Sequence, residues 1–447
     1  MRLYQTAESE RIGSLTKKYL AGGVHYNFHI QDKTVQIYFV KGQGTRLWDV
    51  DGNEYLDLAG RSGSLILGHN HPEYQSILKE CIDRISAIDH VETEYQATKM
   101  LCEILPSCDR VRYSLSGTEA IQNAIRLARA YTNKNLIIKF EGHYHGSADN
   151  IMAQEATDQY VPYDNGAGIY TTKGRDAASL TTQLLILPWN NISVLEEVVS
   201  KRQNEIAAVI TEPICMSGGG ILPQNGYLQK VQKLCNQKNI VFILDEVITG
   251  LRVDLGGAQE HWSLSPDLSI LGKSLGGGSL PVSCICGKKN LMEQYSNATV
   301  IQAGTFNGYP LSMAAVYATL SLLRDNVSAY DRMNQLTRRI HTMIHSSALR
   351  NGVDLTIQGL PGCSVIHNRT EAVERYADYN QNLQFRDSLL RSCFLRYGVI
   401  LSPNTKLYPN IVLSESDLEF LAGRLDDIFR LYNNLKQKWK MITEIYK

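Results

Sequence analysis

The chain has 447 residues, with 45 lysines and arginines balanced by 45 aspartates and glutamates. No block of like charge occurs, which argues against nucleic acid or an anionic membrane as a partner. No apolar run approaches the roughly 20 residues that a membrane helix needs, and the polar N-terminus lacks the core of a signal peptide. We therefore expect a cytoplasmic protein with a small ligand.

The nine cysteines are scattered singly, apart from the close pair Cys284 and Cys286. An odd count without framework spacing is typical of reduced thiols. Alternate residues of a strand share a face, so this pair points the same way. No second ligand pair accompanies it in the sequence, so we predict neither a disulfide nor a metal site there.

The first predicted element is an antiparallel hairpin at 47–57, where apolar and polar residues alternate on both sides of an Asp-Gly-Asn turn. A helical pattern follows from Pro72 to about Ala87. The stretch 150–182 has little periodicity, and long loops in compact enzymes are often lids.

Short apolar runs then alternate with helical stretches, which favours a mostly parallel sheet wrapped by helices. The runs are 136–140, 184–187, 206–210, 241–244 and 268–271.

After about residue 325 the pattern changes to amphipathic helices at 330–346 and 418–436 around short strands, which indicates a separate α+β domain. The predicted division is an N-terminal segment at 1–65 that belongs to the small domain, a large domain at 66–325 and a C-terminal part of the small domain at 326–447.

The most informative residues are Asp245 and Lys273. Four consecutive apolar residues precede Asp245, so a strand buried on both faces delivers this carboxylate to the crevice where open α/β sheets bind ligands. Lys273 follows a second apolar run and Gly272, which leaves room for a flat ligand. An aspartate that keeps a pyridine nitrogen protonated, with a lysine that forms a Schiff base, is typical of pyridoxal phosphate enzymes.

Ser116 and Glu119 form a capping box at the start of a helix that includes 121–130. Gly117 and Thr118 would present N–H groups and a hydroxyl at the positive helix end, where phosphate binds readily. The alternative is an ordinary capped helix. Beside Asp245 and Lys273, the phosphate site is the better interpretation.

Other candidate residues follow predicted strands. Tyr144 lies between His143 and His145 and can stack on a heterocycle; the alternatives are packed aromatics or a metal site, but no supporting ligands at zinc-like spacing accompany the histidines. Glu212 precedes Pro213, which ends a strand, so it faces either the crevice or solvent. Thr305, in a turn-rich stretch, is a candidate phosphate hydroxyl or part of a plain loop.

These segments, in this order, resemble the class III pyridoxal-phosphate aminotransferases of fold type I, and within them the glutamate-1-semialdehyde aminomutase branch. The similarity runs from about Ala21 to Leu320 and is weaker to the end. Its motifs lie at 47–58, 67–72, 116–130, 140–146, 245–260, 266–273 and 303–305.

The resemblance implies an α/β fold in which a seven-stranded, mostly parallel sheet forms the large domain and the chain ends form a smaller α+β domain. It also implies a homodimer that acts on a small amino donor and a carbonyl acceptor, with pyridoxal phosphate as cofactor and its pyridoxamine form during turnover.

Roles for single residues also come from the resemblance. Lys273 would hold the cofactor as a Schiff base and Asp245 would pair with the ring nitrogen, with Glu212 in the surrounding network. Val247 and Tyr144 would contact the two ring faces. The phosphate would be bound by Ser116, Gly117 and Thr118, with Thr305 from the partner subunit.

The sequence departs from the branch at the substrate end. His29 stands about where the aminomutases carry a carboxylate-binding arginine, and a neutral imidazole cannot replace a guanidinium. The stretch 402–410 lacks the branch's glutamate. Arg61 is the candidate for a replacement anion contact, with a structural arginine as the alternative.

We therefore expect an aminotransferase with a different substrate. The alternatives are an aminomutase that moves nitrogen within one molecule, a racemase on the same scaffold, and a catalytically silent binding protein, against which the intact Lys273 and Asp245 argue.

Overall fold

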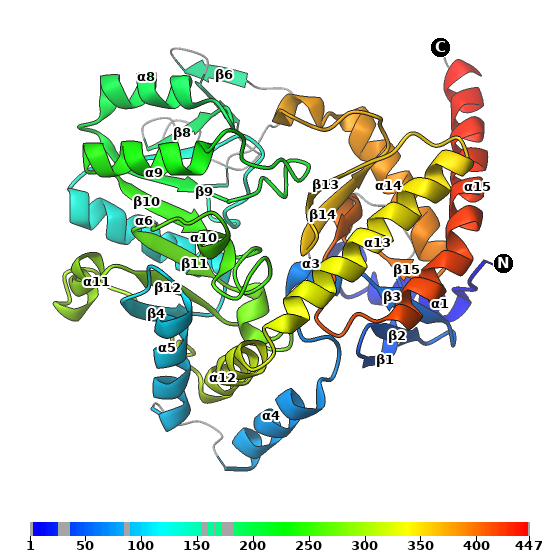
Figure 1. The fold of residues 1–447 in the computed structure, drawn as a ribbon, viewed down its shortest axis with the longest axis horizontal. Coiled ribbons are helices and arrows are strands. Elements are labelled where there is room, and N and C mark those ends of the chain that lie inside the picture. Colours follow the sequence, from blue (N-terminus) through cyan, green and yellow to red (C-terminus); the bar gives the residue numbers. More distant parts are fainter. Residues whose placement is uncertain are drawn as a thin grey trace. The chain divides into compact units, whose positions relative to one another are not determined.

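The computed structural model describes residues 3–25, 36–84, 90–152, 160–163, 167–170 and 183–445. The chain forms two compact units (Figure 1). The terminal unit comprises Met1–Pro72, Ser328–Ala372 and Tyr379–Lys447, and the central unit comprises Glu73–Val327 and Val373–Asp378. Within the described ranges, no helix is both long and apolar enough to span a membrane.

The central unit is built on a seven-stranded sheet in the order β4-β12-β11-β10-β9-β5-β8. Strands β8, β5, β9, β10 and β11 run parallel, and β12 is antiparallel to both of its neighbours. The mostly parallel sheet expected from the sequence is confirmed. The strand bounds are β4 Arg110–Ser114, β5 Leu136–Phe140, β8 Leu184–Leu187, β9 Ile206–Thr211, β10 Val241–Asp245, β11 Leu268–Leu271 and β12 Ser283–Gly287.

Helices cover both faces of this sheet. On one face α6 packs across the central strands, and on β10 the side chains of Val241 and Ile243 join its core cluster. Phe242 and Leu244 point the other way and are also fully buried. Figure 1 shows α8 and α9 beside each other, and α9 contacts β10. The helices are α4 Pro72–Arg84, α5 Glu92–Ile104, α6 Gly117–Thr132, α8 Ile192–Arg202, α9 Tyr227–Lys238, α10 Gly257–His261, α11 Lys289–Ser296 and α12 Pro310–Arg324.

Two parts of the central unit differ from the expectation. Strand β4 carries arginines at 110 and 112 and lies at the sheet edge with exposed positions, so it lacks the apolar run that marks the inner strands. The stretch 150–182 was expected to be a loop without strands. It contains the antiparallel pair β6 Tyr160–Tyr163 and β7 Ala167–Tyr170, and its remainder from residue 153 lies outside the described residues.

The terminal unit contains a four-stranded sheet in the order β1-β2-β3-β15 and a three-stranded sheet in the order β13-β14-β16. The predicted hairpin is present as the antiparallel pair β2 and β3. The elements are α1 Ala7–Thr16, β1 Phe39–Gln43, β2 Arg46–Asp49, β3 Glu54–Asp57, α3 Gly60–Gly63, α13 Ser328–Arg350, β13 Thr356–Leu360, β14 Cys363–His367, α14 Gln381–Arg396, β15 Val399–Ile400, β16 Lys406–Leu407 and α15 Glu415–Ile445.

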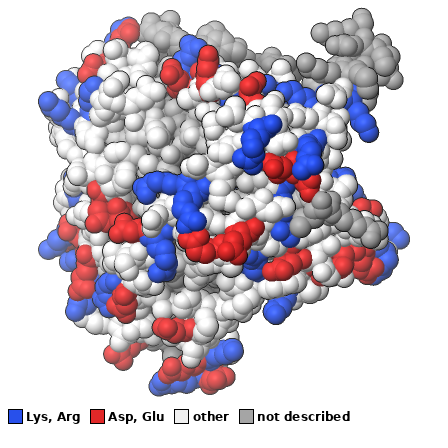
Figure 2. Space-filling view, turned by 45° about the vertical axis from the view of Figure 1, so that its right-hand side comes forward, with Lys and Arg blue, Asp and Glu red and all other residues white. Residues whose placement is uncertain are grey.

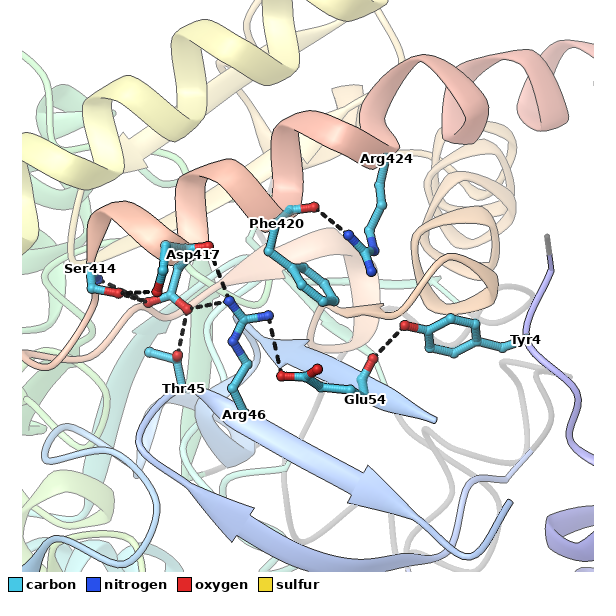
Figure 3. A network of polar contacts seen from close by, with 9 residues as sticks. Tyr4, Thr45, Arg46, Glu54, Ser414, Asp417, Phe420 and Arg424 are labelled. Atoms are coloured by element: carbon cyan, nitrogen blue, oxygen red, sulfur yellow. Dashed lines mark hydrogen bonds and ion pairs between the residues drawn. The ribbon is translucent and has the colours of Figure 1, made fainter. Parts of the chain in front are cut away.

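The Asp417 carboxylate connects the two ends of the chain within the terminal unit (Figure 3). One of its oxygens lies 2.8 Å from Arg46 Nη2 and accepts a hydrogen bond of 2.7 Å from the Thr45 hydroxyl. The other oxygen accepts from the backbone N–H and the hydroxyl of Ser414, both at 2.9 Å. The Arg46 guanidinium also stacks on Phe420, 4.0 Å from the ring centroid. These contacts hold the hairpin against the first turn of α15.

We expect Asp417→Ala to lower the free energy of unfolding by about 2 to 4 kcal/mol, because it leaves a largely buried guanidinium and several donors without their acceptor. Urea unfolding followed by circular dichroism measures the change. The matched control is Glu415→Gln in the same helical turn, where an exposed pair with Arg339 should contribute less than about 1 kcal/mol. Equal effects of the two substitutions would contradict the role of Asp417.

Candidate active site

The strand order brings four candidate segments to one edge of the central sheet. Strands β5, β9, β10 and β11 are consecutive neighbours and run parallel, so their carboxyl ends lie together. In this register Leu244 lies beside Thr211, and Asp245 beside Ile270. The segments that follow these strands carry the candidates His145, Glu212, Asp245 and Lys273.

Asp245 is the last residue of β10 and is 4% exposed. One carboxylate oxygen accepts from the backbone N–H of Val247 at 3.1 Å, and the other lies 2.6 Å from His145 Nδ1. Both oxygens of the Asp245 carboxylate are therefore engaged by groups of this site.

His145 is fully buried, and this burial lowers its pKa, whereas the hydrogen bond to Asp245 opposes the shift. A neutral ring with its proton on Nδ1 donates to Asp245 and leaves Nε2 without a hydrogen. This Nε2 has no hydrogen-bond partner within the described part of the chain. His145 therefore holds the carboxylate without adding a positive charge beside it.

Glu212 and His143 fix the turn that carries Tyr144. Glu212 is 4% exposed, and its carboxylate accepts from the Tyr144 backbone N–H at 2.8 Å. Its own backbone N–H donates to His143 Nδ1 at 3.0 Å. Burial and the Asp245 charge raise the pKa of Tyr144, so the phenol stays protonated. Two buried side chains thus set the position of one partly exposed ring.

Lys273 lies two residues after the end of β11 and is partly buried. Its backbone φ is +43°, a left-handed conformation that is unfavourable for a residue other than glycine. Such strain in a non-glycine residue is often found at functional sites.

The side chain of Val247 contacts both the start of α6 and the residue before Lys273. A Cβ atom added to Gly117 would lie 3.1 Å from Val247 Cγ2, and one added to Gly272 would lie 3.5 Å from Val247 Cγ1. Val247 therefore lies between the start of α6 and the residue that precedes Lys273.

The N-terminus of α6 is capped as the sequence predicted, with one difference. The Ser116 hydroxyl accepts from the Glu119 N–H at 3.2 Å, but the Glu119 carboxylate accepts from the Leu115 N–H and not from that of Ser116. The Ser283 hydroxyl also donates a hydrogen bond of 2.7 Å to the Ser116 carbonyl. Since the helix supplies no acceptor for the N–H groups of Gly117 and Thr118, these two donors are available to an anion.

Three sequence candidates remain. His29 is outside the described residues. Thr305 is an exposed residue of a turn in the central unit. Arg61 belongs to the terminal unit, where it is exposed and has a φ of +49°. Its turn packs on the 402–410 stretch, because a Cβ on Gly60 would lie 2.9 Å from the carbonyl oxygen of Tyr408.

We expect His145→Leu to lower kcat by roughly 10- to 100-fold, the effect of removing a hydrogen bond to a buried charge. His145→Asn retains an N–H near Nδ1 and should recover much of the rate. A loss of rate that His145→Asn does not relieve would indicate a packing role only.

The chain is similar to known proteins in both sequence and structure. Residues 28–356 match the family model for class III aminotransferases. Among curated relatives, glutamate-1-semialdehyde 2,1-aminomutase 1 of Lachnoclostridium phytofermentans is 35% identical and aligns over 82% of this chain and 84% of its own length. The aminomutase of Wigglesworthia glossinidia brevipalpis is 33% identical over 94% and 96%, and that of Natranaerobius thermophilus is 39% identical over 85% and 88%.

Solved structures share the fold. An omega-transaminase from Sphaerobacter thermophilus superposes with a TM-score of 0.86 at 26% identity, and the match covers 96% of this chain and 98% of that protein. A glutamate-1-semialdehyde aminomutase from Pseudomonas aeruginosa has a TM-score of 0.82 at 20% identity, with 96% and 94% covered.

Proposed function

Because this chain belongs to the class III aminotransferase family, we propose that it transfers an amino group between a small amino donor and a keto or aldehyde acceptor at Lys273. It is a pyridoxal-phosphate-dependent enzyme with the α/β fold of type I transferases. When bound, the cofactor supplies an aldehyde that takes up the amino group and a ring that accepts electrons from the substrate's Cα.

The observation that carries this proposal is the position of Val247. Its side chain lies against both Gly117 and Gly272, and the backbone N–H of Val247 binds Asp245. Val247 therefore links the start of α6, the Asp245 carboxylate and the residue before Lys273, which supports assigning all of them to one cofactor site. A flat phosphorylated pyridine aldehyde has the complementary groups, so the residues fit this cofactor.

Each residue then has a defined task. The N–H groups of Gly117 and Thr118 would bind the phosphate, with the cap residue Ser116 holding the helix start. Asp245 would keep a proton on the ring nitrogen, Val247 would contact the ring, and Glu212 would position Tyr144 for a second contact with it. Lys273 would hold the cofactor, and its amine would take a proton from the substrate's Cα as general base and return it as general acid.

Transfer between two molecules is favoured over an aminomutase reaction by the substrate-side residues. The stretch Ser402–Asn410 contains no carboxylate, and Ser402, Thr405, Tyr408 and Asn410 are buried. His29 replaces the arginine expected in the aminomutase branch. The names of the curated relatives favour the second candidate, intramolecular amino transfer on glutamate 1-semialdehyde.

The two candidates differ in their need for a separate amino donor. We expect the cofactor-loaded enzyme to form product only with a donor, at one molecule of donor consumed per molecule of product, in a screen of amines read by product mass. Turnover of glutamate 1-semialdehyde alone, with no donor consumed, would establish the aminomutase reaction in its place.

We also propose a homodimer in which Thr305 reaches the phosphate of the partner subunit. The support is the exposure of the turn that carries Thr305, flanked by Ile301 at 73% and Phe306 at 55% exposed. Both signs of charge are interspersed on the face shown in Figure 2, consistent with a small-molecule enzyme in the cytoplasm. Sedimentation of Phe306→Glu, expected to shift toward monomer with weaker cofactor binding, tests the dimer.

Arg61 is proposed to bind the carboxylate of the substrate. Arg61→Ala should then raise KM for carboxylate-bearing substrates about 10-fold or more while KM for simple amines stays the same. Steady-state kinetics with a matched pair, such as an amino acid and the corresponding amine, measure the difference. The proposed contact fails if both KM values change equally.

A further inference from the structure

We propose that Cys108 and Cys102 are an oxidation-sensitive dithiol, in which Cys108 reacts with hydrogen peroxide and Cys102 then closes an intramolecular disulfide. The site is separate from the candidate active site. Cys102 lies in the last turn of α5, and Cys108 lies between α5 and β4.

Four thiols meet at this place. The sulfurs of Cys102 and Cys108 are 3.6 Å apart, and those of Cys284 and Cys286 on β12 are 3.7 Å apart. The Cys286 thiol also lies close enough to Cys108 to affect its pKa. In the sequence only Cys284 and Cys286 stand out as a close pair. Cys102 and Cys108 come near them because β4, which follows Cys108, pairs with β12.

The surroundings favour the thiolate at Cys108. The thiol of Cys102, 3.6 Å away, and that of Cys286 lower the pKa of Cys108, whereas burial and Asp109 raise it. Thiolates, and not thiols, attack peroxides and disulfides. Burial raises the pKa of Cys286, so the pair on β12 stays protonated.

Spacing makes Cys102 the resolving residue. It is the thiol whose sulfur lies 3.6 Å from that of Cys108, and Cys284 and Cys286 are at most 1% exposed. The two sulfurs need to approach from 3.6 Å to the disulfide length of about 2.0 Å. No group of three or more His, Cys, Asp or Glu side chains among the described residues is arranged to hold a metal ion. Thiol oxidation is therefore the chemistry that fits the site.

The two steps balance as follows. The Cys108 thiolate attacks one peroxide oxygen, the O–O bond breaks, and a hydroxide leaves and is protonated to water, so sulfur is oxidised to a sulfenic acid by two electrons. The Cys102 sulfur then attacks the sulfenic sulfur, the S–O bond breaks and a second water leaves. Overall, two thiols and one hydrogen peroxide give one disulfide and two waters.

The test uses the full-length, cofactor-loaded enzyme with a small excess of hydrogen peroxide. We expect titratable thiols, measured after denaturation, to fall from nine by the two that form the disulfide. Peptide mapping should find the Cys102–Cys108 link, and dithiothreitol should reverse it. A disulfide elsewhere, or oxygen addition at other residues without this link, would overturn the proposal.

Variants separate the two roles. Cys102→Ser should stop at a sulfenic acid on Cys108 that dimedone traps, and Cys108→Ser should lower the rate of thiol loss about 10-fold or more. The matched control is Cys81→Ser, because Cys81 is also partly exposed but burial raises its pKa. Equal rates for the variants at positions 108 and 81 would refute the assignment.

A measurement on the unmodified enzyme covers the case in which a variant does not fold. In a brief iodoacetamide pulse at pH 6.5, Cys108 should be alkylated about 10-fold faster than Cys81, as peptide mass spectrometry reports. Faster labelling of Cys81 would contradict a reactive Cys108.

Discussion

Lys273→Ala is expected to lower kcat by about 10⁴-fold or more, since it removes the proton carrier and the nucleophile that attaches the cofactor. The folded structure should be retained, because the side chain is only partly buried and the left-handed backbone conformation of Lys273 does not depend on its amine. The variant should still bind the cofactor noncovalently through the helix start at Gly117. Steady-state turnover and the intact mass after borohydride treatment measure the two effects.

Two further variants show whether the amine acts by its chemistry or by its charge. Lys273→Arg keeps a positive charge but has no amine that can deprotonate near neutral pH, so it should be as inactive as the alanine variant. Lys288→Ala is the matched control: Lys288 follows β12 and pairs with Asp267, so its loss should leave kcat within about 3-fold of the unmodified enzyme. Near-normal turnover of either variant at position 273 would refute the assignment of Lys273.

Asp245→Asn is expected to lower kcat by roughly 10²-fold or more, because a neutral amide does not hold a proton on the ring nitrogen as an ionised carboxylate does. The asparagine side chain has nearly the same shape as that of aspartate. The amide oxygen can accept from Val247, while the amide NH₂ would face His145. A proton moved from Nδ1 to Nε2 of His145 lets Nδ1 accept from this NH₂, so the fold can accommodate the change.

The neighbouring carboxylate provides the control for Asp245. Glu246 is 1% exposed, and its side chain accepts from Thr249, Ala258 and Gln259, which makes it a structural residue. Glu246→Gln should lower the urea midpoint while kcat per folded molecule stays within about 3-fold. If the two substitutions affected kcat equally, the specific role of Asp245 would be lost.

The sequence by itself determined the elements whose burial is continuous or periodic. The five strands expected from the sequence, β5, β8, β9, β10 and β11, are mostly apolar and are buried along their whole length, and such runs are visible without any neighbour. The hairpin of β2 and β3 could be predicted because the residues of its turn, Asp-Gly-Asn, favour that turn by themselves. The same local signals placed Asp245 and Lys273 at strand ends and Ser116 at a helix start.

Other features depended on which strands became neighbours. The edge strand β4 has arginines and half-exposed positions, so its sequence resembles a loop. The hydrogen bond from His145 to Asp245 exists because β9 lies between β5 and β10 and aligns their ends. In the sequence, the pair His143 and His145 after β5 was the only local indication of this hydrogen bond.

The tertiary structure alone decided three contacts. The turn that carries Arg61 packs against Tyr408. Val247 lies between Gly117 and Gly272. Cys102 and Cys108 lie beside the cysteines of β12. Local patterns report whether a residue is buried, because burial follows the period of a helix or strand. They do not report the partner across a sheet or turn, because that choice depends on the packing of segments far apart in the sequence.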